Sequence, residues 1–139
     1  MNGMTGGAPG ADRIVRDYWE RFEARDFDGA GELLAEDVVI EWPVTRERIA
    51  GRSNVVELNR AYPEPWGHIR VLDAIADGER VAGRVRVDAP AGIDFALGFY
   101  DVRDGTIRRG TEYWVTEGDE PPYDRSGWAT RTDPLADTP

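Results

Sequence analysis

The chain has 139 residues, a length that suits one domain with a single hydrophobic core. Its formal net charge of −10 disfavours nucleic acid and anionic membranes as partners, because binding to phosphates needs clustered cations. Cysteine is absent and all 17 basic residues are arginine, which excludes disulfides, thiolate chemistry and a lysine Schiff base. The chain has neither an apolar run of membrane-spanning length nor a signal-peptide pattern, so we expect a cytoplasmic protein.

The N-terminal third predicts two helices followed by a strand. Residues 1–11 are rich in glycine, and we expect them to form a flexible leader. Residues 12–23 follow a helical period with an apolar face of Ile14, Val15, Tyr18, Trp19 and Phe22. Asp26 or Asp28 can then cap a second helix that carries Ala30, Leu33 and Leu34. After residue 37 the period changes to two, and a strand presents Val38, Ile40 and Trp42 on one face until Pro43.

The rest of the chain predicts one more helix and two hairpins. Residues 44–50 are interpreted as a polar connection, and Ser53 as the cap of a helix that reaches Ala61. Strands 68–76 and 80–88 turn at Asp77-Gly78, and strands 93–103 and 106–116 turn at Asp104-Gly105. Residues 117–139 predict an irregular tail that could fold over a pocket mouth. This order favours an α+β domain over residues 12–116, with a bent sheet wrapped over its helices.

The run ARDFDGAGELLAED leading into VVIEWP, with the closing TEYW, resembles the nuclear transport factor 2-like superfamily. That superfamily includes the SnoaL-like polyketide cyclases and the ketosteroid isomerases. The resemblance implies a cone-shaped, curved, mixed or antiparallel sheet, with a ligand cavity between its concave face and the helices. It leaves the activity open, because the fold hosts isomerases, cyclases, hydrolases, dehydratases and binding proteins.

Glu112 is the principal catalytic candidate. Strand parity places Gly110, Glu112 and Trp114 on one face, and an inward face would surround the carboxylate with aromatic side chains. Loss of water should raise the pKa of Glu112 and make it a better base near neutral pH. The resemblance also places Glu112 where SnoaL-like cyclases carry an acidic catalytic residue, although theirs is aspartate. The alternatives are a Glu112 paired with an inward arginine such as Arg86, or one turned to solvent.

Tyr18 and His68 are further catalytic candidates. Tyr18 matches the helix tyrosine that ketosteroid isomerases use as an oxyanion donor. The base of those isomerases falls at Trp42 here and their second acid near Gly98, so we do not expect steroid isomerisation by that mechanism. A packed core tyrosine is the alternative for Tyr18. For His68, the single histidine, the choice lies between an acid at the pocket rim and an ordinary strand-end residue.

Aromatic and inward positions predict a pocket for a small hydrophobic molecule. The proposed ligand-binding residues are Trp42, Tyr62, Trp66, Gly98, Tyr100 and Trp114. We expect neither a metal nor a cofactor, because cysteine is absent and the acidic residues are scattered. The resemblance implies that the Gly98 side of the third long strand faces the cavity, so its apolar stripe, Ile93, Phe95, Leu97 and Phe99, would lie on the outer sheet face and predicts a homodimer through that face.

Two functions remain open at this point. The first is a cofactor-free acid/base enzyme of the isomerase, cyclase or dehydratase type, acting on a hydrophobic carbonyl or polyketide-like compound with Glu112 as base. The second is a non-catalytic module that binds a small apolar or aromatic ligand. An arginine paired with Glu112 favours the binding module, whereas an aromatic surround favours the enzyme.

Overall fold

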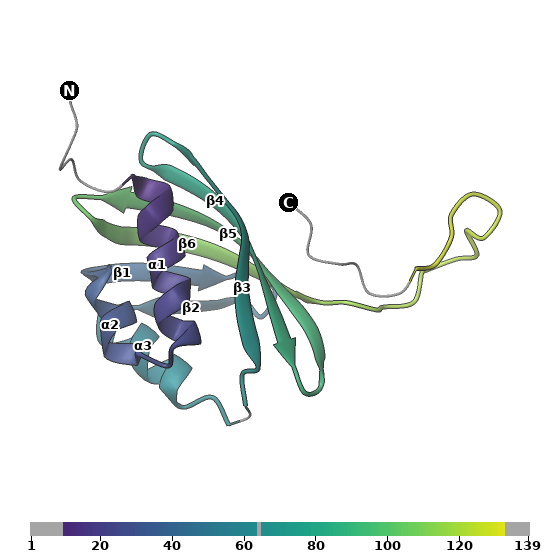
Figure 1. Cartoon of the computed structure of the whole chain (residues 1–139), viewed down its shortest axis with the longest axis horizontal. Coiled ribbons are helices and arrows are strands. Elements are labelled where there is room, and N and C mark those ends of the chain that lie inside the picture. Colours follow the sequence, from purple (N-terminus) through teal and green to yellow (C-terminus); the bar gives the residue numbers. More distant parts are fainter. Residues whose placement is uncertain (1–9, 64, 133–139) are drawn as a thin grey trace.

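The computed structural model describes residues 10–63 and 65–132, which form three helices against one six-stranded sheet (Figure 1). The helices are α1 (Ala11–Glu23), α2 (Phe27–Glu32) and α3 (Arg52–Arg60). The strands are β1 (Leu34–Trp42), β2 (Glu47–Ala50), β3 (His68–Asp77), β4 (Arg80–Ala89), β5 (Gly92–Arg103) and β6 (Thr106–Thr116). The predicted α+β class is therefore confirmed. The predicted leader lies almost entirely outside the described residues, and Ala11 already belongs to α1.

The sheet is mixed and bent. Its strand order is β2-β1-β6-β5-β4-β3, and every neighbouring pair is antiparallel except β1 and β6, which are parallel. The register shifts at two places: β3 has an extra residue between Val71 and Asp73, and β6 has one between Ile107 and Arg109, opposite Val102 and Asp101 of β5, and such extra residues bend the strands. The bending curves the sheet over the helices, so that the inner face of β6 faces α1 (Figure 1).

The core lies between α1 and the inner face of the sheet. All five residues of the predicted apolar face of α1 are buried. The Asp26 side chain accepts a hydrogen bond from the backbone N–H of Gly29 at 3.0 Å, so Asp26 rather than Asp28 caps α2. Val38 and Ile40 are almost fully buried and Trp42 packs against the core, which confirms that the predicted apolar face of β1 points inward.

Three boundaries differ from the sequence expectations. Helix α2 ends at Glu32, because Leu33 leaves the helical conformation and Leu34 is already buried in β1. The expected polar connection contains β2, a short edge strand that buries only Ile49 and therefore has almost no periodic signal. Helix α3 begins at Arg52, after Gly51 at a φ of 94°, so Ser53 does not cap it.

The tail has no regular element over residues 117–132 and extends away from the domain in Figure 1. Its side chains hydrogen-bond within the tail itself, as when Arg131 donates to the Glu120 carboxylate at 3.0 Å. None of these residues lines the cavity described below, so residues 117–132 do not cover the pocket mouth in this structure. Within the described part of the chain, no helix combines the length and the apolar character needed to cross a membrane.

Candidate functional site

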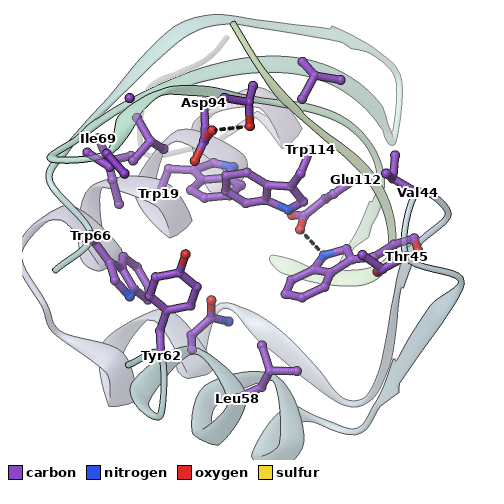
Figure 2. A pocket seen from close by; sticks show the side chains of 18 of the residues that line it. Trp19, Val44, Thr45, Leu58, Tyr62, Trp66, Ile69, Asp94, Glu112 and Trp114 are labelled. Carbon is purple, nitrogen blue, oxygen red and sulfur yellow. Dashed lines mark hydrogen bonds between the residues drawn. The ribbon is translucent and has the colours of Figure 1, made fainter. Parts of the chain in front are cut away.

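A cavity of about 540 Å³ opens between the inner face of the sheet, α3 and the loops at the open end of the domain (Figure 2). Its walls are mainly aromatic and apolar, with five ring systems from Trp19, Trp42, Tyr62, Trp66 and Trp114. Figure 2 shows Tyr62 and Trp66 on one side of the opening, opposite Trp19 and Trp114. This is the volume and character of a site for a small, flat, largely apolar ligand.

Glu112 lies in this cavity between Trp42 and Trp114 (Figure 2). It sits on β6, and its inward direction follows from the strand alternation that also turns Gly110 and Trp114 inward. Only 3% of Glu112 is exposed. Its Oε1 accepts a hydrogen bond from Trp42 Nε1 at 2.8 Å, and its Oε2 accepts one from the Tyr100 hydroxyl at 2.7 Å. Each oxygen therefore keeps a lone pair that the ligand can use.

Two opposing effects set the pKa of Glu112. Burial removes water from the carboxylate and raises its pKa above the ordinary glutamate value. Hydrogen bonds from Trp42 and Tyr100 stabilise the charged form and offset part of that rise. The N–H of Trp114 has a smaller influence in the same direction, although it makes no hydrogen bond of good geometry. Desolvation dominates, so the net shift of the pKa is upward.

No described arginine neutralises Glu112. Arg86, the arginine suspected from the sequence, lies on the opposite face of β4, where it donates to the Asp88 carboxylate at 2.9 Å. The partners of Glu112 are thus neutral donors in an aromatic surround. This is the arrangement that the sequence analysis associated with the enzyme rather than with the binding module.

Tyr100 lies beneath Glu112, and two glycines, Gly98 and Gly110, make room for its ring. It is 2% exposed and does not line the cavity. A Cβ on Gly98 would collide with the Tyr100 hydroxyl and ring, and one on Gly110 would lie 3.0 Å from Tyr100 Cδ1. Gly83, which pairs with Gly98 on the neighbouring strand, leaves ordinary van der Waals space. The cradle holds the Tyr100 hydroxyl against Glu112, the cross-strand partner of Gly98.

The structure brings five of the nine predicted site residues to the cavity wall: Glu112, Trp42, Tyr62, Trp66 and Trp114. Gly98 and Tyr100 point inward as predicted but lie under Glu112, where they support the carboxylate instead of touching a ligand. Tyr18 is a buried core residue outside the cavity lining. Burial and the nearby charge of Glu112 raise its pKa well above the ordinary tyrosine value.

His68 lies outside the cavity, at the start of β3. Its Nδ1 is 2.7 Å from Oε2 of Glu23, the last residue of α1, and Glu23 Oε1 accepts a hydrogen bond from the Ile69 N–H at 2.8 Å. These contacts fasten the end of α1 to β3 and lower the pKa of Glu23. The strand-end interpretation of His68 fits this position, and the pocket-rim interpretation does not.

Sequence reasoning did not name Asp94 or Trp19 among the site residues. Asp94 lines the cavity, and its Oδ1 accepts a hydrogen bond from the Thr116 hydroxyl at 2.8 Å. Asp94 lies near the start of β5 and shares strand parity with Gly98 and Tyr100, so the alternation of that strand points to it. Trp19 also lines the cavity from the buried face of α1, a position that suits a core residue as well as an aromatic wall.

The described residues contain no group of three histidine, aspartate or glutamate side chains that could hold a metal ion.

The fold and the buried carboxylate define a curved-sheet pocket protein of the nuclear transport factor 2-like type. The model of the SnoaL-like domain family matches residues 15–110, and the chain belongs to that family. No curated protein matches the chain. A provisionally assigned ketosteroid isomerase from Kribbella flavida DSM 17836 is 32% identical over 92% of this chain and 93% of that one, with a TM-score of 0.82.

Two more distant structures share the fold. An LEH-like epoxide hydrolase from M. tuberculosis is 24% identical, with 76% of this chain and 82% of that chain covered and a TM-score of 0.64. A protein with a ketosteroid isomerase-like fold from Catenulispora acidiphila DSM 44928, in complex with trimethylamine, is 15% identical. That comparison covers 72% of this chain and 83% of the other, with a TM-score of 0.62.

Proposed function

We propose that the protein is a cofactor-independent acid/base enzyme in which Glu112 removes a proton from carbon next to a carbonyl group of a small hydrophobic compound. The observation that carries the proposal is the buried Glu112 carboxylate, which faces an aromatic cavity and is held by two neutral donors. Its raised pKa makes it a stronger base than an exposed glutamate.

The hydrogen bonds fix the direction of the carboxylate. Trp42 Nε1 can only donate, and the Tyr100 hydroxyl donates its proton to Glu112, so neither group competes for the substrate proton. The Tyr62 hydroxyl is an exposed neutral donor on the opposite wall, where it can meet the carbonyl oxygen of a bound ligand.

The reaction class follows from what the site contains. Proton transfer at carbon is the common step of isomerases, cyclases and dehydratases, and it needs a base but no bound metal. Isomerisation of a steroid by the ketosteroid isomerase mechanism is not proposed, because Trp42 and Gly98 occupy the positions of that enzyme's two acids. The name of the Kribbella relative is thus not transferred to this chain.

A binding module without turnover is the second candidate. A structure of similar fold is in complex with trimethylamine, so a pocket of this shape can hold a small molecule. In that case Glu112 would act as a fixed anion, which is consistent with the hydrogen bonds to both of its oxygens.

Proton exchange with solvent separates the two candidates without knowledge of the natural substrate. A panel of aryl-alkyl ketones is incubated with the protein in D₂O, and loss of the α-proton signals is followed by NMR. We expect the wild type to accelerate exchange of at least one ketone, and Glu112→Gln to lower that rate by about two to four decades. Near-UV circular dichroism checks that the tryptophan environment survives the substitution. Equal rates for wild type and variant would remove Glu112 as the base, and no exchange at all would favour the binding module.

A further inference from the structure

The charged residues of the cavity are all acidic. Among the described residues that line it, Glu47, Asp94 and Glu112 carry carboxylates, and none is arginine or histidine. Glu112 lies deepest, Asp94 is partly buried, and Glu47 is exposed at the rim. Figure 2 shows Asp94 above Trp19, with the oxygen that does not bond Thr116 turned toward the cavity. The negative charge thus spans the cavity from its deep end to its opening.

The walls between these carboxylates are electron-rich ring faces. Trp42 and Trp114 flank Glu112 and lie at 6.4 Å between ring centroids, and Tyr62 and Trp66 form the facing wall at 6.5 Å from each other. An aromatic face carries negative electrostatic potential and attracts a cation within about 6 Å. Trp66 already shows this attraction, because the Arg25 guanidinium, which is outside the lining, lies 5.4 Å from its ring centroid.

The buried Glu112 carboxylate is stabilised by the dipoles of neutral donors and not by a positive charge. Its partners Trp42 and Tyr100 are neutral, so part of the cost of burying Glu112 remains and its pKa is displaced upward. A neutral ligand that expelled water from the cavity would increase this cost. A cationic ligand would offset it, because an opposite charge within a few ångströms stabilises the ionised form.

We propose that the cavity selects a compound with one positive charge, a protonated or quaternary amine on an apolar body. Three observations support this inference. Carboxylates lie at both ends of the cavity, aromatic faces lie between them, and the described lining residues include no cation. The inference rests on the proposed function in one respect, because it names the class of compound that enters the same cavity. The preference for a positive charge does not require that the compound is turned over.

The test compares two probes of the same shape, choline and 3,3-dimethylbutan-1-ol, which differ in the charge of one atom. Titration calorimetry at millimolar probe concentration gives both dissociation constants. We expect choline to bind about tenfold more tightly than the neutral alcohol. Equal affinities, tighter binding of the alcohol, or no binding of either probe would overturn the proposal.

Variants separate the sources of the preference. Glu112→Gln and Asp94→Asn should each weaken choline binding several-fold and leave the alcohol unchanged. Glu41→Gln, which removes a carboxylate that bonds Arg48 outside the cavity lining, controls for net charge and should keep the preference. Tyr62→Phe keeps a ring face and should bind choline well, whereas Tyr62→Leu should not. If Glu41→Gln abolished the preference as fully as Glu112→Gln, long-range attraction and not the cavity would be its cause.

The outcomes also separate this inference from the proposed function. A choline preference that depends on Glu112, without proton exchange of any ketone, amine-bearing ketones included, would support the cation site and overturn the enzyme. Exchange of neutral ketones that depends on Glu112, without a choline preference, would support the enzyme and overturn the cation site.

Discussion

Two neutral donors and the loss of water act on one carboxyl group at the centre of this molecule. Burial raises the pKa of Glu112, and the bonds from Trp42 and Tyr100 limit the rise. Strand parity and the family resemblance predicted the inward direction of Glu112. The Tyr100 contact could not be predicted, because it depends on two glycines on different strands that let the ring lie flat beneath the carboxylate.

The pKa of Glu112 affects how the free energy of unfolding depends on pH. Below the unfolded-state pKa of about 4.3, Glu112 is protonated in both states and its burial carries no charge penalty. As the pH rises through the raised folded-state pKa, the buried carboxylate ionises and that advantage of the protonated form is lost. The difference in free energy of unfolding, wild type minus Glu112→Gln, should therefore fall as the pH rises.

Urea denaturation of both proteins at a series of pH values from 4 upward measures this difference. Groups that titrate alike in both proteins, such as Glu23 and Asp88 with their lowered pKa values, cancel. A difference that stayed level or rose with pH would show that the pKa of Glu112 is not raised.

Among the elements, those with strong local signals were predicted well. The Asp-Gly turns predicted both hairpins, and the aromatic face of α1 predicted which side of that helix packs in the core. Strand β2 and the end of α2 were missed because their positions are decided by contacts with β1. Ile49 pairs with Ile40, and the buried Leu34 already belongs to β1, contacts that a local period does not encode.

Gly98 of β5 supports the site because it leaves room for the Tyr100 ring. Gly98→Ala should push Tyr100 away from Glu112 and lower the free energy of unfolding by about 1–3 kcal/mol, because the new methyl group has no space. Gly83→Ala, at the paired position on β4 where a methyl group fits, is the matched control and should be nearly neutral. Urea denaturation compares the two. Equal tolerance of both substitutions would mean that the glycine does not hold Tyr100 in place.

The outer face of the sheet carries exposed apolar side chains on β5 and β6. Leu97 and Phe99 of β5 and Tyr113 and Val115 of β6 are exposed and adjacent, with Leu97 opposite Tyr113. The stripe predicted from the sequence therefore continues onto β6, while Ile93 and Phe95 are only half-exposed. An apolar face of this kind on a globular domain favours association with a second copy.

We therefore predict a homodimer through this face. Sedimentation velocity at micromolar concentration should give a dimer for the wild type and a monomer for Phe99→Arg, which places a charge in the interface. Tyr123→Arg, an equally drastic change at an exposed tail residue, should remain dimeric. A monomeric wild type would contradict the prediction.

The pH dependence of proton exchange shows whether Glu112 is a buried base. With the ketone that the wild type exchanges fastest, the rate is measured across the pH range for wild type and Glu112→Gln. We expect a rate that rises with pH through an apparent pKa above the ordinary glutamate value of about 4.3, and the loss of this rise in the variant. A midpoint at or below the ordinary value, or the same profile in both proteins, would contradict it.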